Sequence, residues 1–125
     1  MSFYDATVLK IDEDIEEQVL LGVQRYHITC FASVCPYPIK VGEKYRVKFY
    51  LFVADEFCPN EVHDDAAPAM TQDGNGFRYN LIGKLTGNIL DCGIKIEDDV
   101  FTEQYGYLNG KKIKVSVDRL DVEFL

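Results

Sequence analysis

The feature that most constrains the fold of this chain is an alternation of side chains over residues 45–53. Every second residue in this range is aromatic or aliphatic, and the range is rich in β-branched and aromatic types. A period of two places successive side chains on opposite faces of a strand. The other face begins with Arg46 and Lys48 and ends with Tyr50 and Phe52. The pattern predicts a β-strand whose second face meets a loop, a neighbouring strand or a partner.

Alternation also predicts strands elsewhere in the chain. The predicted ranges are 4–11, 19–23, 25–32, 77–85, 89–96 and 112–124. Ile11, Ile15 and Val19 are spaced by four, so one short helix is a rival interpretation of this region. The β-forming residues on both sides favour strand, loop and strand instead. Helical turns are predicted near residues 60–65 and within residues 97–107.

Glycines and a change of parity indicate bends in the second half. Gly83, Gly87 and Gly93 interrupt apolar segments, as glycines do at bulges and tight bends. The alternation changes parity at Asp118–Arg119, which predicts a bulge in the last strand. We therefore predict one all-β domain over residues 1–125, with at most one short helix. The architecture we expect is a small Greek-key barrel of five to seven strands, and a two-sheet sandwich is the alternative. An irregular loop is expected at residues 54–76.

Charge and composition limit the partners. The chain of 125 residues has 13 basic and 21 acidic residues, a formal charge of −8. This charge repels nucleic acid and anionic lipid at long range and attracts a cationic partner. There is no apolar run long enough for a membrane helix and no basic and apolar secretory signal. The four cysteines are interpreted as reduced thiols, so we predict a cytoplasmic protein with no membrane partner.

The C-terminal half carries a resemblance to a known fold family. It reads Leu81-Ile82-Gly83-Lys84-Leu85-Thr86-Gly87, then Leu90-Asp91-Cys92-Gly93-Ile94, then Val117-Asp118-Arg119-Leu120-Asp121-Val122. This order of a glycine-bent strand, a turn and a last strand with Arg-Leu-Asp resembles the end of small OB-fold barrels in uncharacterised bacterial proteins. The resemblance implies an OB-like barrel, and many OB domains bind nucleic acid on a basic, aromatic strand face. It implies no catalytic residue.

Cys58 and His63 are the candidates for metal or thiol chemistry. Zinc favours thiolate and imidazole ligands, but the close Cys-x2-Cys pairs of structural zinc sites are missing. A nucleophilic cysteine needs a lowered pKa, whereas the acidic residues around Cys58 favour a raised one. The sequence therefore predicts no bound metal, no cofactor and no catalytic residue. A metal- or thiol-dependent enzyme centred on these two residues is kept as the second alternative function.

Acidic clusters and aromatic residues predict a surface that binds a protein. Carboxylates gather at residues 12–17, 55–65 and 97–103. Aromatic anchors and complementary charge are typical of protein interfaces. The residues predicted for this surface are Tyr37, Tyr50, Phe52, Asp55, Glu56, Phe57, Asp64 and Asp65. The main hypothesis is a non-catalytic binding or inhibitor module, such as a toxin-immunity protein. The first alternative is an OB-like binder of single-stranded nucleic acid, and an acidic charge that serves solubility alone remains the simplest interpretation of the composition.

Overall fold

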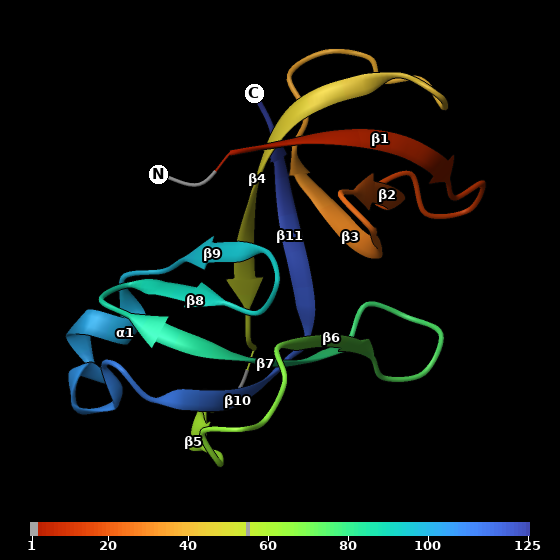
Figure 1. Ribbon diagram of the computed structural model, residues 1–125. Coiled ribbons are helices and arrows are strands. Elements are labelled where there is room, and N and C mark those ends of the chain that lie inside the picture. The colour runs from red at the N-terminus through yellow and green to blue at the C-terminus, as the bar shows by residue number, and fades with distance from the viewer. Residues whose placement is uncertain (1–2, 55) are drawn as a thin grey trace.

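Five strands close into a barrel (Figure 1). The computed structural model describes residues 3–54 and 56–125. The barrel strands are β1 (Tyr4–Ile11), β2 (Gln18–Val23), β3 (Tyr26–Val34), β4 (Lys44–Phe52) and β11 (Arg119–Phe124). They hydrogen-bond in the closed order β1-β2-β3-β11-β4, in which β3 and β11 run parallel and all other neighbours are antiparallel. The predicted all-β barrel is confirmed, as is the strand, loop and strand arrangement of residues 4–23.

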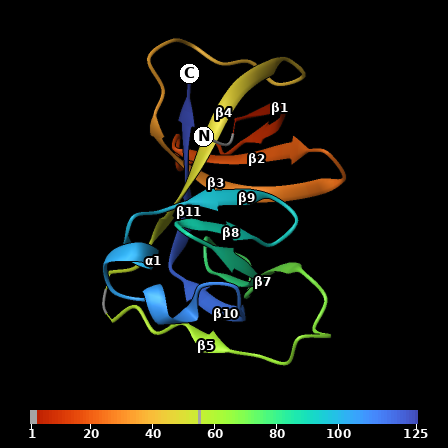
Figure 2. The ribbon, with the colours of Figure 1, turned by 60° about the vertical axis from the view of Figure 1, so that its left-hand side comes forward.

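The part of the chain that follows β4 and precedes β11 forms a second sheet, which lies below the barrel in both ribbon views (Figure 2). Its strands are β5 (Asn60–Glu61), β6 (Ala69–Gln72), β7 (Tyr79–Thr86), β8 (Ile89–Asp91), β9 (Lys95–Glu97) and β10 (Lys112–Val117). Their order is β5-β10-β7-β8-β9, and β6 also pairs with β7. The short helix α1 (Val100–Glu103) and the 3-10 turn η1 (Gly106–Leu108) lead into β10, where helical turns were expected. The described residues thus form eleven strands, because the second sheet adds six to the predicted barrel.

The change of parity near Asp118 marks a crossing between the two sheets. β10 ends at Val117 and β11 begins at Arg119, so the predicted bulge within one strand is wrong. The Asp118 amide donates to the carbonyl of Phe52 at 3.0 Å, and its carboxylate accepts the Ala54 amide at 2.7 Å. These bonds hold the junction where the chain leaves the second sheet and enters the barrel.

The predicted strand over residues 89–96 is a hairpin in the structure. Gly93 adopts a φ of 107°, a conformation that L side chains rarely adopt, and it turns the chain between β8 and β9. The residues that alternate in this range are buried, as the pattern requires: Leu90, Cys92, Ile94 and Ile96. The glycine therefore changes the direction of the strand without moving its apolar side chains out of the core.

Residues 54–76 are more regular than predicted. Two short strands in this range pair with the second sheet, β5 with β10 and β6 with β7. The helical turn expected near residues 60–65 is replaced by strand at Asn60–Glu61 and then a turn, in which the Ala66 amide donates to the carbonyl of His63 at 3.0 Å. The described part of the chain contains no helix long and apolar enough to cross a membrane.

One hydrophobic cluster runs through both the barrel and the second sheet. Its largest fully buried side chains include Phe49, Leu21, Ile28 and Leu120 from the barrel, Leu81, Leu90 and Ile113 from the second sheet, and Phe101 from α1. Each such side chain contributes about 1.5–3 kcal/mol. Two tyrosines join the sheets: the Tyr79 hydroxyl accepts the Thr29 amide at 2.9 Å, and the Tyr4 hydroxyl accepts the Lys95 amide at 2.7 Å.

Candidate functional site at the mouth of the barrel

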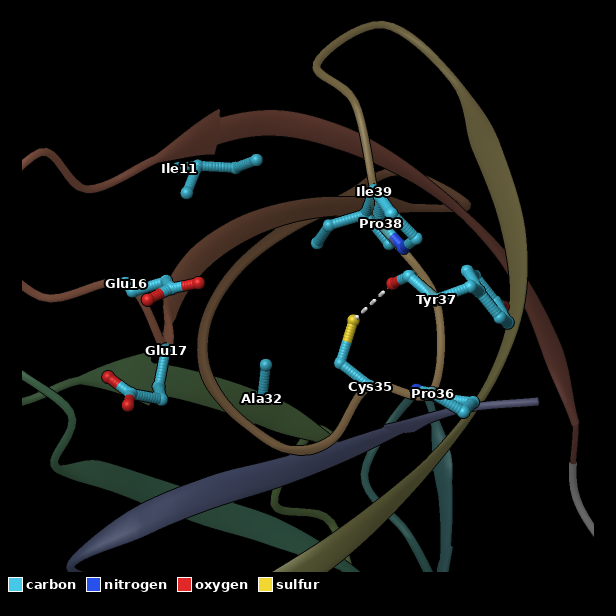
Figure 3. A pocket seen from close by; sticks show the side chains of 9 residues that line it. All are labelled: Ile11, Glu16, Glu17, Ala32, Cys35, Pro36, Tyr37, Pro38 and Ile39. Carbon is cyan, nitrogen blue, oxygen red and sulfur yellow. Dashed lines mark hydrogen bonds between the residues drawn. The ribbon is translucent and has the colours of Figure 1, made fainter.

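A cavity of about 650 Å³ opens at the end of the barrel where β1 and β3 finish (Figure 3). It lies between the acidic loop that joins β1 to β2 and the proline-containing loop that joins β3 to β4. Its apolar walls come from Ile11, Ala32, Tyr37 and Ile39. Mouths of barrels are a recurrent place for binding sites, and the volume is in the range of such sites.

The β3–β4 loop is fixed although it has no regular structure. Pro36 and Pro38 provide no amide donors, so this segment does not extend a strand ladder. The Tyr37 hydroxyl donates to the carbonyl of Leu125 at 2.8 Å, and its ring packs on Tyr45 with centroids 5.7 Å apart. The Lys40 amide in turn donates to the hydroxyl of Tyr45 at 2.9 Å. The wall of the cavity is therefore tied to β4 and to the C-terminus.

The thiol of Cys35 faces the cavity in Figure 3 and donates to the carbonyl of Tyr37 at 3.2 Å. The carboxylate of Glu16 faces the same space from the opposite side. Glu17, next to it in the chain, also lines the cavity. Among the described residues, Glu16 and Glu17 line this cavity and no lysine or arginine does, so its electrostatic preference is for a cationic group.

The β1–β2 loop is an organised turn that displays carboxylates. The Asp12 carboxylate accepts the amides of Asp14 and Ile15 at 2.9 and 2.8 Å. Both hydrogen bonds lower the pKa of Asp12, and the bond from Ile15 has the larger effect. Glu13, Asp14, Glu16 and Glu17 are all exposed. Ile15, at the tip of the turn, is 43% exposed, so the loop offers an apolar side chain surrounded by negative charge.

A second hollow of about 560 Å³ lies on the other side of the same loop. Two exposed aliphatic side chains, Leu9 and Val41, line it together with the charged residues Lys10, Asp12, Glu13 and Asp14. Ile11 lines both hollows. The acidic loop therefore lies as a ridge between two hollows, of which the first is mainly apolar and the second is lined by both aliphatic and charged side chains. We call this ridge and the two hollows the barrel mouth.

The predicted surface residues do not form one surface. Tyr37 lies at the barrel mouth, whereas Tyr50 and Phe52 lie on the outer face of β4. The Tyr50 hydroxyl donates to the carboxylate of Glu123 at 2.8 Å. Burial of the Tyr50 side chain, and to a lesser extent this hydrogen bond, raises the pKa of Tyr50 to about 12. The Arg119 guanidinium lies 4.1 Å from the centre of the Phe52 ring. Both aromatic side chains are thus already engaged by neighbours within the chain.

The remaining predicted residues lie beside the second sheet. Phe57 packs against Phe101 and Tyr105 with centroids 5.8 and 5.4 Å apart, so it is a structural anchor. Glu56 and Asp64 are exposed. Asp65 is also exposed, and its carboxylate oxygen lies 2.7 Å from Nδ1 of His63. Asp55 lies outside the described residues.

Cys58 and His63 do not join a larger cluster. Among residues 3–54 and 56–125, no three His, Cys, Asp or Glu side chains converge in a way that would hold a metal ion. Desolvation raises the pKa of the Cys58 thiol, and the negative charge of Glu56 raises it further. A raised pKa favours the neutral thiol, which is the less reactive form.

Among the residues that line the barrel mouth, only the acidic ones carry a signal that is visible in the sequence. Residues 12–17 contain five carboxylates, and this signal points to the correct loop. Ile11, Ala32 and Ile39 carry no such signal, because their convergence depends on how the barrel closes. In Figure 1 the acidic loop lies far from β5, so residues 12–17 and the acidic residues around β5 belong to different ends of the molecule.

Comparison with known families gives one match. Residues 1–125 match the family described as uncharacterised conserved protein UCP019853, and the chain belongs to that family. No curated protein and no solved structure matches the chain.

Proposed function

We propose that this member of the family is a non-catalytic module that binds a basic segment of a protein partner at the barrel mouth. The observation that carries the proposal is the acidic ridge of residues 13–17 between two hollows that both expose aliphatic side chains. Aliphatic groups next to carboxylates are complementary to a segment in which lysine or arginine alternates with apolar residues. Negative charge at the rim accelerates the encounter with a basic partner, while burial of the apolar groups supplies affinity.

An inhibitor of a basic enzyme, as in toxin and immunity protein pairs, is the specific role that we propose for such a module. A formal charge of −8 on 125 residues supports strong attraction to a cationic partner. The exposed Ile15 supports a contact that a purely solubilising acidic loop does not need. In this role a neighbouring gene in the source genome encodes the basic enzyme, and the two purified proteins form a complex that salt weakens.

The test is a titration of the ¹⁵N-labelled protein with a synthetic peptide of alternating lysine and leucine. We expect shift changes in the Glu16 and Glu17 amides and in the β3–β4 loop. Affinity should fall when NaCl rises from about 0.02 to about 0.3 M, because the Debye length shortens several-fold. The double variant Glu16→Gln/Glu17→Gln should bind at least about tenfold more weakly.

The matched control removes two carboxylates from the other end of the molecule. Asp64 and Glu103 are both exposed and lie outside the barrel mouth. The variant Asp64→Asn/Glu103→Gln should keep the affinity within about twofold, because screened charges at a distance act weakly. Equal loss in the two variants, or shift changes confined to the second sheet, would refute a site at the mouth.

Binding of single-stranded nucleic acid by an OB-like barrel is the second candidate. It is supported by the five-stranded barrel and by the outer face of β4, where Lys48, Tyr50 and Phe52 follow one another as the sequence predicted. However, Lys48 lies 5.2 Å from the ring centre of Tyr50, and Arg119 lies over Phe52. Rings with a face covered in this way offer less stacking surface to a base. A gel shift with single-stranded DNA and RNA at low salt decides: no shift at micromolar protein eliminates this candidate.

A metal- or thiol-dependent enzyme at Cys58 and His63 has the least support. The raised pKa of the Cys58 thiol disfavours a nucleophilic thiolate, and the His63 ring is engaged with Asp65. The test is elemental analysis of the purified protein together with Cys58→Ala. A stoichiometric metal that the variant loses would revive this function and displace the binding module.

A further inference from the structure

We propose that a third cavity, at the junction of the barrel and the second sheet, binds a small molecule that carries phosphate groups. The cavity has a volume of about 360 Å³ and lies beside the turn that joins β2 to β3. This turn is at the opposite end of β2 from the acidic loop. The proposal therefore concerns a different site from the barrel mouth and does not depend on the proposed partner.

The charge around this cavity is reversed relative to the rest of the chain. Acidic residues outnumber basic ones by 21 to 13 in the sequence. The cavity is lined by three cations, Arg25, Lys84 and Lys112, and by one carboxylate, Asp91. A local excess of positive charge in a concave site attracts anions even where the net charge of the protein is negative.

The register of the second sheet brings two of these cations together. Lys112 of β10 is directly opposite Lys84 of β7. Side chains that are directly opposite in an antiparallel pair share one face, with Cβ atoms about 4.5–5.5 Å apart, and like charges in such a pair destabilise the sheet. Asp91, opposite Lys84 on β8, offsets part of this repulsion, and an anion bound between the two lysines would offset the rest.

The described carboxylates do not neutralise these cations. Arg25, Lys84 and Lys112 are in no ion pair within the described part of the chain. Asp91 of β8 is directly opposite Lys84 and accepts the amide of Gly93 at 3.2 Å, and this single carboxylate leaves an excess of positive charge among the described residues of the lining. The three positive groups thus remain available to a ligand.

The walls of the cavity are held in place by contacts within the chain. The Lys112 ammonium donates one hydrogen bond to the carbonyl of Ala66 at 2.7 Å and keeps two further donors. The Tyr26 side chain lies directly against Gly93, where an added Cβ would be 2.1 Å from its hydroxyl. Figure 2 shows the corresponding β2–β3 and β8–β9 turns side by side. The Arg25 guanidinium lies 5.6 Å from the Tyr26 ring centre.

Phosphate is the anion that this arrangement fits best. The donors come from three separate elements, the β2–β3 turn, β7 and β10, and so approach from different directions. A guanidinium can bind phosphate through two parallel hydrogen bonds, and lysines add point charges. Tyr26, Ala67 and Pro68 supply apolar walls for the organic part of the molecule. The volume is at the lower end for ligand sites, which indicates a small molecule and not a polymer.

The experiment measures binding of inorganic pyrophosphate by isothermal titration calorimetry at about 0.02 M NaCl, where charge interactions are only weakly screened. We expect saturable binding with one site, and shift changes of the Arg25, Lys84 and Gly93 amides in ¹⁵N spectra. The double variant Arg25→Gln/Lys84→Gln should weaken binding at least about tenfold. Both side chains belong to exposed residues, so the variant should fold, which circular dichroism checks.

The control variant Lys40→Gln/Lys44→Gln also removes two positive charges, but from exposed positions near the barrel mouth. It should keep the affinity for pyrophosphate within about twofold. The proposal is overturned by the absence of binding up to about 10 mM pyrophosphate, or by an equal loss in the control variant. Citrate that binds as tightly as pyrophosphate would show a general carboxylate site and overturn the phosphate assignment. A single-stranded oligonucleotide that pyrophosphate does not displace would overturn the small-molecule assignment.

Discussion

Gly83→Ala tests whether the second sheet depends on the close approach of β7 and β8. Gly83 is buried within β7. A Cβ added there would be 2.2 Å from the carbonyl oxygen of Asp91 and 2.8 Å from the amide nitrogen of Cys92. Both atoms belong to the backbone, so no side chain can rotate away to make room. The added methyl must push the two strands apart.

The expected loss of stability follows from two opposing effects. Overpacking of a well-packed region costs about 1–3 kcal/mol, and a clash with backbone belongs at the upper end, about 3 kcal/mol. Replacing glycine by alanine also reduces the entropy of the unfolded chain, which offsets about 0.4–1 kcal/mol. The net destabilisation is about 2 kcal/mol. For a domain of this size, 1 kcal/mol corresponds to about 4 °C, so Tm should fall by about 8 °C.

The assay is thermal and urea unfolding followed by circular dichroism, with Gly76→Ala as the control. Gly76 has no positive φ, and an added Cβ there meets no heavy atom within 4 Å. The control should therefore leave Tm unchanged or raise it slightly, because only the effect on the unfolded chain remains. A Tm for Gly83→Ala within about 2 °C of the parent protein would refute the close approach of the two strands.

Three further predictions concern tyrosine and cysteine side chains. Tyr79→Phe leaves the Thr29 amide without its acceptor and should cost about 1–3 kcal/mol in urea unfolding, whereas Tyr107→Phe, at a side chain that is 73% exposed, should change stability by less than about 0.5 kcal/mol. A thiol reagent should label two cysteines in the native protein and four in urea; the exposed pair is Cys35 and Cys58, and the buried pair is Cys30 and Cys92. Burial raises the pKa of the Cys92 thiol from about 9 to about 11, so the folded state keeps a proton that the unfolded state releases. The free energy of unfolding should therefore fall as the pH rises from about 9 to about 11. The variant Cys92→Ala should reduce this dependence on pH.

The sequence predicted the barrel because its strands obey a simple rule. In β4 the residues of one parity, such as Val47 and Phe49, are buried, and those of the other parity face outward. Local alternation is enough to identify such a strand, whatever its neighbours are. The rule does not distinguish one long strand from two strands in different sheets, since both keep their alternation. The segments 89–96 and 112–124 were therefore predicted as single strands, although each contains two.

The partners of each strand could not be predicted in the same way. The pairing of β3 with β11 joins residues that are 90 positions apart, as in Phe31 opposite Asp121. Non-local pairs of this kind are fixed by closure of the whole barrel and leave no local pattern. The resemblance to OB barrels was based on residues 81–87, 90–94 and 117–122, and the structure places the first two segments in the region of the second sheet and residues 119–122 in the barrel strand β11. The front half of the chain supplies the other four barrel strands.

The two proposed sites differ in how far local sequence could reveal them. The acidic ridge is contiguous, so its charge is visible in residues 12–17 before any fold is known. The cationic cavity joins Arg25, Lys84 and Lys112, which are separated by 59 and 28 positions, so no local run of basic residues contains all three. Only the register of β10 on β7 turns two unremarked lysines into a pair of like charges. Within the described residues these two lysines form no ion pair, and Asp91 is the one carboxylate that lines the cavity with them. In a chain with an excess of carboxylates, this local excess of positive charge is the feature that an anionic ligand would explain.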